Sequence, residues 1–219
     1  MNLNQYYKIK NELPEFTKLI AVSKTKPVED ILTLYQEGQR VFGENRALEL
    51  RDKQEILPKD IEWHFIGHLQ TNKIKYIAPY VHLIHSVDSF ELLQEIDKQA
   101  QKHNRVIPCL IQFYIADEVT KFGFDLNEAV QMFESENFNK LKNIKIIGLM
   151  GMGTFTDNRE QTRLEFHHLA DIFKTLKEKY FSNNADFKEI SMGMTDDYQI
   201  AIEEGSTMVR IGSAIFGSR

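Results

Sequence analysis

The chain has 219 residues, of which 42% are hydrophobic and 27% charged, values close to those of an average globular protein. Its 27 lysines and arginines are outnumbered by 32 aspartates and glutamates, which gives a formal net charge of −5 and argues against a nucleic-acid partner, since phosphate backbones are bound by clustered basic residues. The apolar runs fall short of the roughly 20 residues of a membrane helix, and the polar start of the chain is unlike a secretory signal, so we expect a cytoplasmic protein without a membrane partner.

Short apolar runs alternate with stretches of helical period along the whole chain. The runs predict strands at 18–22, 40–42, 62–66, 82–87, 106–114, 144–150, 188–191 and 207–212. Between them, the periodicity predicts helices at 28–37, 46–56, 70–77, 89–103, 126–136, 159–180 and 197–204. The charged residues of the second and sixth of these helices are expected on solvated outer faces.

This alternation is typical of an α/β fold with a parallel sheet, and it predicts a single (β/α)8 barrel domain spanning residues 1–219. The alternative is an open doubly wound sheet, whose dinucleotide-binding form is disfavoured because no GxGxxG follows the first strand. The only cysteine, Cys109, lies in the apolar run VIPCLIQF and is expected to be buried and inert.

The first predicted strand ends at Ser23 and Lys24, on the face where such barrels carry their chemistry. An amine at the mouth of a barrel is partly desolvated, which favours its neutral form and makes it a nucleophile toward carbonyls. Position alone leaves two interpretations of Lys24 open, a lysine that forms a Schiff base and a solvated surface charge.

The last two predicted strands end in SMGMTDD and RIGS. Hydroxyls at Ser191 and Thr195, with backbone N–H groups at Gly193, Gly212 and Ser213, can bind a phosphate without a lysine. The alternative is that the glycines only permit tight turns. Within the last strand, Arg210 either has a role in a site or forms a salt bridge to a barrel carboxylate.

Histidines recur in HFIGH and HLIH and raise the question of a metal site. His64 and His68 are separated by a glycine that interrupts any helix, so they should not share a helical face as two ligands would. His82 and His85 stand three apart in a strand and should point to opposite sides. We therefore expect no metal site.

Taken together, AVSKTKP, FGEN, WHFIGHLQTNK, GLM and the long segment from SMGMTDD to the C-terminus resemble the pyridoxal-phosphate homeostasis protein family. The resemblance implies the barrel of fold type III pyridoxal-phosphate proteins, similar to the N-terminal domain of alanine racemase. It also implies that Lys24 holds pyridoxal 5′-phosphate as a Schiff base, that Arg210 faces the pyridine nitrogen, and that Asn45 and His64 line the ring. The residues implied on the phosphate are Ser191, Gly193, Thr195, Gly212 and Ser213.

Members of that family are regarded as carriers and regulators of the cofactor, without an established turnover reaction. The resemblance therefore implies a protein without catalytic residues that buffers pyridoxal phosphate or delivers it transiently to apo-enzymes, with effects on vitamin B6 and amino-acid pools. Alanine racemase carries a second, β-rich domain with a tyrosine base contributed across a dimer. Because this sequence stops at Arg219, we expect no second base and a monomer.

Two departures from the family keep catalysis open. Tyr114 and Ala116 stand near the end of the fifth predicted strand, where the family usually has an asparagine. A tyrosine near a Schiff base could donate a proton, so a slow amino-acid racemase or lyase is the alternative function. A Schiff-base aldolase of sugar phosphates would use the same lysine and phosphate loops without a cofactor.

Overall fold

The computed structural model describes residues 1–116 and 122–217, and in this part of the chain eight parallel strands form a closed barrel in chain order. The strands are β1 (Lys18–Val22), β2 (Val41–Glu44), β3 (Glu62–Phe65), β4 (Leu83–Val87), β5 (Ile107–Tyr114), β6 (Ile144–Met152), β7 (Glu189–Ser191) and β8 (Met208–Ile211). The barrel closes where β8 pairs with β1, with Ala21 opposite Ile211. The predicted (β/α)8 barrel is thus confirmed, and the open sheet was the wrong alternative.

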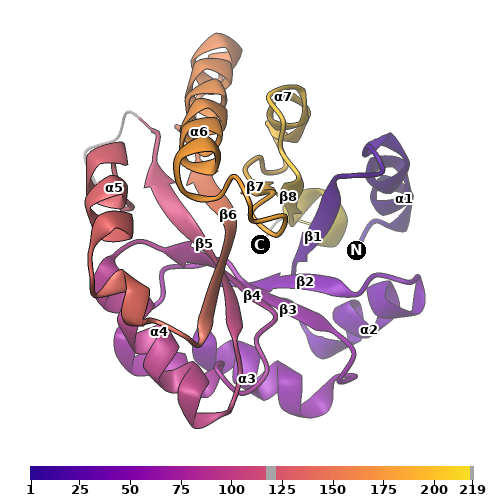
Figure 1. Ribbon diagram of the computed structural model, residues 1–219. Coiled ribbons are helices and arrows are strands. Elements are labelled where there is room, and N and C mark those ends of the chain that lie inside the picture. The colour runs from indigo at the N-terminus through magenta and orange to yellow at the C-terminus, as the bar shows by residue number, and fades with distance from the viewer. Residues whose placement is uncertain (117–121, 218–219) are drawn as a thin grey trace.

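Helices surround the strands (Figure 1). Those between strands are α2 (Val28–Gln36), α3 (Ala47–Ile56), α4 (Phe90–Lys102), α5 (Leu126–Glu134), α6 (Arg159–Tyr180) and α7 (Tyr198–Glu203). Two 3-10 helices, η1 (Thr71–Tyr76) and η2 (Phe138–Lys140), complete the connections, while α1 (Leu3–Glu12) precedes β1 and α8 (Ser213–Phe216) follows β8. Local sequence explains several starts: Asp125 and Glu128 form a capping box at α5, and the Ser89 hydroxyl caps α4.

Two features differ from the sequence-based expectation. The helix expected at 70–77 is the 3-10 helix η1, in which the N–H groups of Lys73 and Ile77 donate to carbonyls three residues earlier. A 3-10 helix rises further per residue than an α-helix, which suits the short connection from β3 to β4. Helix α1 was not expected, because its sequence is mostly polar and buries only Tyr6 and Ile9.

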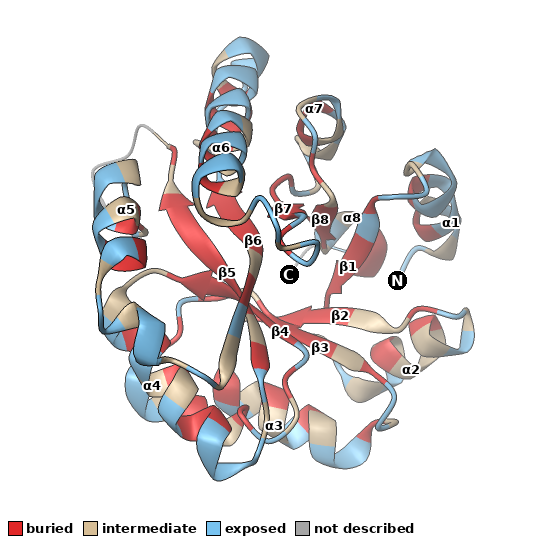
Figure 2. Cartoon of the chain, in the orientation of Figure 1, coloured by how far each residue is buried: buried red, intermediate tan, exposed pale blue. Residues whose placement is uncertain are grey.

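The interior of the barrel is filled by a small apolar layer from five strands, separate from the larger core between strands and helices. Its members are Ile20, Leu83, Leu110, Met150 and Met208. Figure 2 shows the buried strands at the centre and the exposed outer faces of the helices. Cys109 is buried as expected, and this burial raises the pKa of its thiol. Within residues 1–116 and 122–217, the helices are too short or too polar to cross a bilayer.

Candidate functional site

A cavity of about 700 Å³ opens where β1 and β8 end, at the carboxyl ends of the strands. Six of the residues singled out in the sequence line it: Lys24, Asn45, Thr195, Arg210, Gly212 and Ser213. The other three, His64, Ser191 and Gly193, are outside its lining. A second hollow of about 840 Å³ lies on the other side of Asn45, against α3 and η1, and it includes neither Lys24 nor Arg210.

The loop that carries Lys24 is held by a buried ion pair. Lys53, on α3, donates from Nζ to the carbonyl of Ser23 at 2.8 Å and to Glu44 Oε1 at 2.7 Å. The Ser23 hydroxyl donates to the same carboxylate oxygen at 2.6 Å. Burial raises the pKa of Glu44, an effect larger than the opposing one of the Lys53 ammonium. The carbonyl and the hydroxyl of Ser23, the residue before Lys24, are therefore both held by hydrogen bonds.

The residue after Lys24 is fixed as well. Thr25 adopts a left-handed backbone conformation, with φ of 63°, and its N–H donates to Glu49 Oε1 at 2.5 Å. Lys53 Nζ donates to that same oxygen at 2.7 Å. A positive φ costs a threonine free energy, and the hydrogen bond from its N–H to Glu49, which Lys53 holds in place, offsets part of that cost. The half-buried Lys24 is consequently carried on a turn of defined geometry.

Arg210 forms the cationic wall of the cavity. Its side chain is buried, and it donates from Nη1 to Ser191 Oγ at 2.6 Å and from Nη2 to the carbonyl of Gly151 at 3.1 Å. Burial lowers the pKa of Arg210 to about 10, so that the guanidinium remains charged at neutral pH. Ser191 is fully buried, and its hydroxyl also bonds His85 Nδ1 at 2.9 Å. Ser191 therefore supports Arg210 from beneath the cavity.

The loops after β7 and β8 present a pair of hydroxyls. Ser213 Oγ donates to Thr195 Oγ1 at 3.1 Å, which joins the two loops at the cavity surface. Gly193 turns the chain toward this pair with φ of 93°, and a Cβ there would lie 2.5 Å from the Cβ of Ala201. Asp197 accepts from the N–H of Met194 at 2.5 Å, and burial raises the pKa of its carboxyl. Two hydroxyls at a glycine turn suit an anion with several oxygens.

Asn45 and His64 were both expected to line the ring of the cofactor, but only Asn45 lines the cavity. Asn45 lines the cavity, and its buried Oδ1 has no hydrogen-bond partner among the described residues. His64 lies inside the barrel, where its Nδ1 is 2.8 Å from His85 Nε2. Burial lowers the pKa of His64 and that of His85 well below the usual value for histidine, so both rings are neutral.

Tyr114 and Ala116 line a smaller hollow of about 240 Å³ beside the cavity. The two spaces share Met152 and Met194 in their walls, but Lys24 does not line the smaller one. Tyr114 is thus close to the cavity without forming its wall.

The sequence interpretation missed Lys53 and placed it on a solvated face, which is wrong because its side chain is only 7% exposed. Lys53 follows the buried Leu50 by three positions and therefore shares its helix face. This spacing could have predicted from the sequence that Lys53 is buried. Glu44, quoted within FGEN but given no role, is the buried partner that this lysine meets.

Comparisons with known proteins agree with the fold. The alanine racemase N-terminal domain family matches residues 3–219. The pyridoxal phosphate homeostasis protein of Aquifex aeolicus (strain VF5) is 43% identical over 203 residues, which cover 92% of this chain and 87% of that protein. PipY of Synechococcus elongatus PCC7942 has been solved without PLP and with PLP bound; these structures match with TM-scores of 0.90 and 0.87 at 32% and 31% identity. Each match covers 98% of this chain and 99% of the PipY chain.

Proposed function

Because the chain belongs to the pyridoxal phosphate homeostasis protein family, we propose that it binds pyridoxal 5′-phosphate in the cavity beside Lys24 and helps to maintain the supply of this cofactor. One observation carries the proposal: a single cavity presents an amine, a buried guanidinium and a pair of hydroxyls, from Lys24, Arg210 and Thr195 with Ser213. When bound, the cofactor supplies an aldehyde that condenses with amines and a ring that can accept electrons.

The residues of the cavity fit the parts of this cofactor. The Lys24 amine suits the aldehyde, as a Schiff base, and the hydroxyls of Thr195 and Ser213 suit the phosphate together with backbone N–H groups around Gly212. The unsatisfied Oδ1 of Asn45 is an acceptor on the wall of the cavity. These groups approach the cavity from different strands, so they can contact different parts of one bound molecule.

Ser191, Gly193 and His64 act from outside the cavity wall in this proposal. The hydroxyl of Ser191 accepts a hydrogen bond from Arg210 and contacts His85, which supports a positioning role rather than direct contact with the phosphate. Gly193 provides the turn that brings the hydroxyl loop to the cavity. His64 supports His85 from the next layer of the barrel.

We further propose that the protein holds and delivers the cofactor rather than turning over a substrate. Arg210 stays cationic at neutral pH, and a fixed cation at the ring nitrogen would disfavour protonation there and weaken the ring as an electron acceptor. A single-domain, monomeric protein of the cytoplasm that contacts apo-enzymes transiently fits this role.

The cofactor site is tested by a visible absorbance spectrum of the purified protein after addition of pyridoxal phosphate, followed by borohydride reduction and peptide mass mapping. We expect a reducible imine band, with the cofactor mass on Lys24, that is absent in Lys24→Ala. Lys26→Ala is the matched control, because Lys26 lies two residues away and lines the other hollow; it should keep the band. A protein without a band, or a label on another lysine, would contradict the site.

Carrier and enzyme are distinguished by two further measurements on the loaded protein. Transfer of the cofactor to an apo-enzyme should restore the activity of that enzyme. Deuterium from solvent should not enter the α-carbon of amino acids faster than with free cofactor. Faster deuterium incorporation that depends on Tyr114 would instead establish a slow racemase or lyase.

A further inference from the structure

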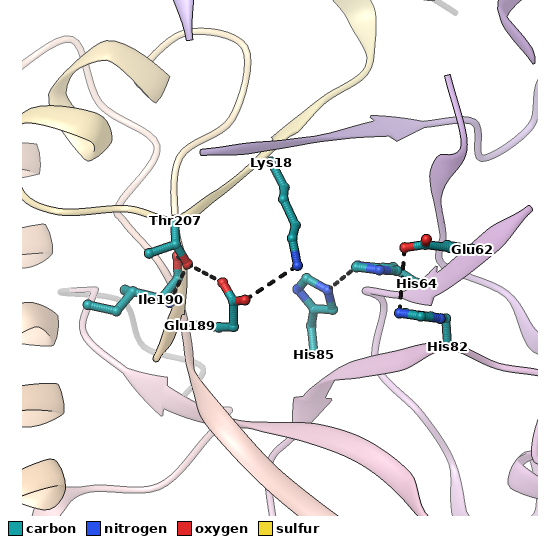
Figure 3. Close-up of polar contacts among 8 residues, drawn as sticks. All are labelled: Lys18, Glu62, His64, His82, His85, Glu189, Ile190 and Thr207. Atoms are coloured by element: carbon teal, nitrogen blue, oxygen red, sulfur yellow. Dashed lines mark hydrogen bonds and ion pairs between the residues drawn. The ribbon is translucent and has the colours of Figure 1, made fainter. Parts of the chain in front are cut away.

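Two histidines and a glutamate meet where β3 and β4 begin, at the end of the barrel opposite the proposed cofactor cavity. Figure 3 shows the three side chains together. Glu62 is the first residue of β3, His64 follows it on the same strand, and His82 immediately precedes β4. One potential ligand atom from each of the three lies within 4.8 Å of the others. The sequence interpretation compared histidines that are close in sequence, His64 with His68 and His82 with His85, whereas His64 and His82 become neighbours because β3 pairs with β4.

His64 has an unused nitrogen at this place. His64 as a residue is only 2% exposed, and its buried Nε2 has no hydrogen-bond partner among the described residues. The other nitrogen, Nδ1, is occupied by His85 Nε2 at 2.8 Å. A buried polar atom without a partner costs free energy, and a bound ligand would remove that cost.

The contacts behind His64 are those that orient a metal-binding imidazole. A lone pair on Nε2 requires the ring proton to sit on Nδ1, from where it is donated to His85 Nε2. His85 then carries its own proton on Nδ1 and donates it to Ser191 Oγ at 2.9 Å. Ligand histidines commonly have their second nitrogen held in this way, which fixes the tautomer and the direction of the ring.

Glu62 and His82 supply two further donors at the surface. His82 Nε2 and Glu62 Oε2 are 3.5 Å apart, close to the roughly 3.3 Å that separates two ligands of a tetrahedral zinc ion with bonds of about 2.0 Å. Their side chains are 53% and 44% exposed, so an ion can enter from solvent. The rings of His64 and His82 are parallel, with centroids 5.6 Å apart, and the exposed His82 ring is the one that can turn to complete the site.

The surrounding charges permit a cation. The ammonium of Lys18, drawn in Figure 3, lies 3.4 Å from Glu189 Oε1. Thr207 donates to the other oxygen of Glu189 at 2.6 Å, which holds this carboxylate in place. Because Lys18 and Glu189 offset each other, the carboxylate of Glu62 leaves the site with a net negative charge.

We propose that Glu62, His64 and His82 form a binding site for a divalent transition metal of the zinc type, with a fourth position open to water. Two imidazoles and one carboxylate are ligands that zinc accepts, and an open fourth position is common in such three-ligand sites. The site is separate from the cofactor cavity and extends the function beyond cofactor binding. Hydrogen bonds through His85 and Ser191 connect it to Arg210.

The test uses the full chain as Lys24→Ala, freed of metal by a chelator, because pyridoxal phosphate itself binds metal ions. Titration with Zn²⁺ in a calorimeter should show one ion per chain, and Co²⁺ should give the visible absorption of a tetrahedral site. Glu62→Gln and His82→Ala should each weaken Zn²⁺ binding at least tenfold. Both positions are partly exposed, so folding should be retained.

His103→Ala is the matched control, since His103 is exposed at the end of α4 and remote in sequence from the three ligands. Its Zn²⁺ affinity should equal that of the parent. Absence of Zn²⁺ binding at micromolar concentration would overturn the proposal, and so would binding that Glu62→Gln and His82→Ala leave unchanged. Because the parent in these tests lacks Lys24, neither result depends on the cofactor proposal.

Discussion

Lys53 Nζ lies 2.7 Å from Glu44 Oε1, with both side chains buried beneath the turn that carries Lys24. The pair therefore connects the stability of the fold to the position of the Lys24 amine. A buried ion pair is weak proof of stability, but its disruption leaves an uncompensated charge in the protein interior.

Lys53→Met should destabilise the protein by about 3–5 kcal/mol, because it leaves the carboxylate of Glu44 buried and unpaired. The pKa of Glu44, already raised by burial, should rise further. A carboxyl whose pKa is higher in the folded than in the unfolded protein stabilises the fold fully below its unfolded pKa. This contribution to the free energy of unfolding is lost as pH rises through the folded pKa. The loss measured by urea unfolding should thus be larger at pH 8 than at pH 5.

Lys174→Met, on the exposed face of α6, is the control for this variant and should change stability little at either pH. Equal destabilisation of Lys53→Met at both pH values would show that Glu44 is not the group left uncompensated.

Ser191→Ala should weaken binding of both pyridoxal phosphate and pyridoxal about tenfold or more, since a hydrogen bond to a charged group contributes about 1.5–3 kcal/mol. The reason is that Arg210 loses the hydroxyl that its Nη1 contacts at 2.6 Å. The two dissociation constants are measured by titration of the imine absorbance. A loss confined to the phosphorylated form would instead place Ser191 on the phosphate.

Thr195→Val and Ser213→Ala should each weaken binding of pyridoxal phosphate by about 1 kcal/mol, roughly fivefold, because each removes one hydroxyl of the pair at the cavity surface. Binding of pyridoxal, which has no phosphate, should stay the same. If both ligands lost affinity equally, the hydroxyl pair would act on the shape of the cavity rather than on the phosphate.

Cys109 should resist alkylation by iodoacetamide at pH 8 in the native protein and react fully in 6 M guanidinium chloride. The thiol is completely buried, and its raised pKa leaves little thiolate to react. Mass spectrometry of the intact chain measures the extent of labelling. Rapid labelling of the native protein would mean that β5 opens readily around this residue.

The strands were predictable because buried parallel strands are short, continuous apolar runs such as KLIAV and IKIIGLM. Their order in chain and barrel is the same, so residues at their carboxyl ends, such as Lys24 and Arg210, could be expected at one cavity. Helix α1 could not be predicted in this way, because few of its residues face the core and its docking depends on contacts such as that of the Asn2 N–H with the carbonyl of Ile215.

Contacts across strands were the main limit of the sequence interpretation. Periodicity indicates which face of an element a residue occupies, but not which residue from another element lies opposite it. The contacts of Lys53 with Glu44, of Ser191 with His85, and of His64 with His82 all depend on such pairing. The resemblance to a family predicted the residues of the proposed cofactor cavity. The contacts beneath that cavity, such as those of Ser191 with His85, are known only from the folded chain.

The pairing of β8 with β1 also determines when the proposed cofactor cavity forms. Lys24 follows the first strand of the barrel, whereas Arg210 lies in the eighth strand and Ser213 just after it, so the ribosome makes Lys24 well before the other two. A nascent chain therefore has its amine long before it has the guanidinium and the second hydroxyl, and these meet only when the last strand is inserted beside the first. A chain without β8 thus lacks part of the wall of this cavity, and it should not capture the cofactor at the proposed site.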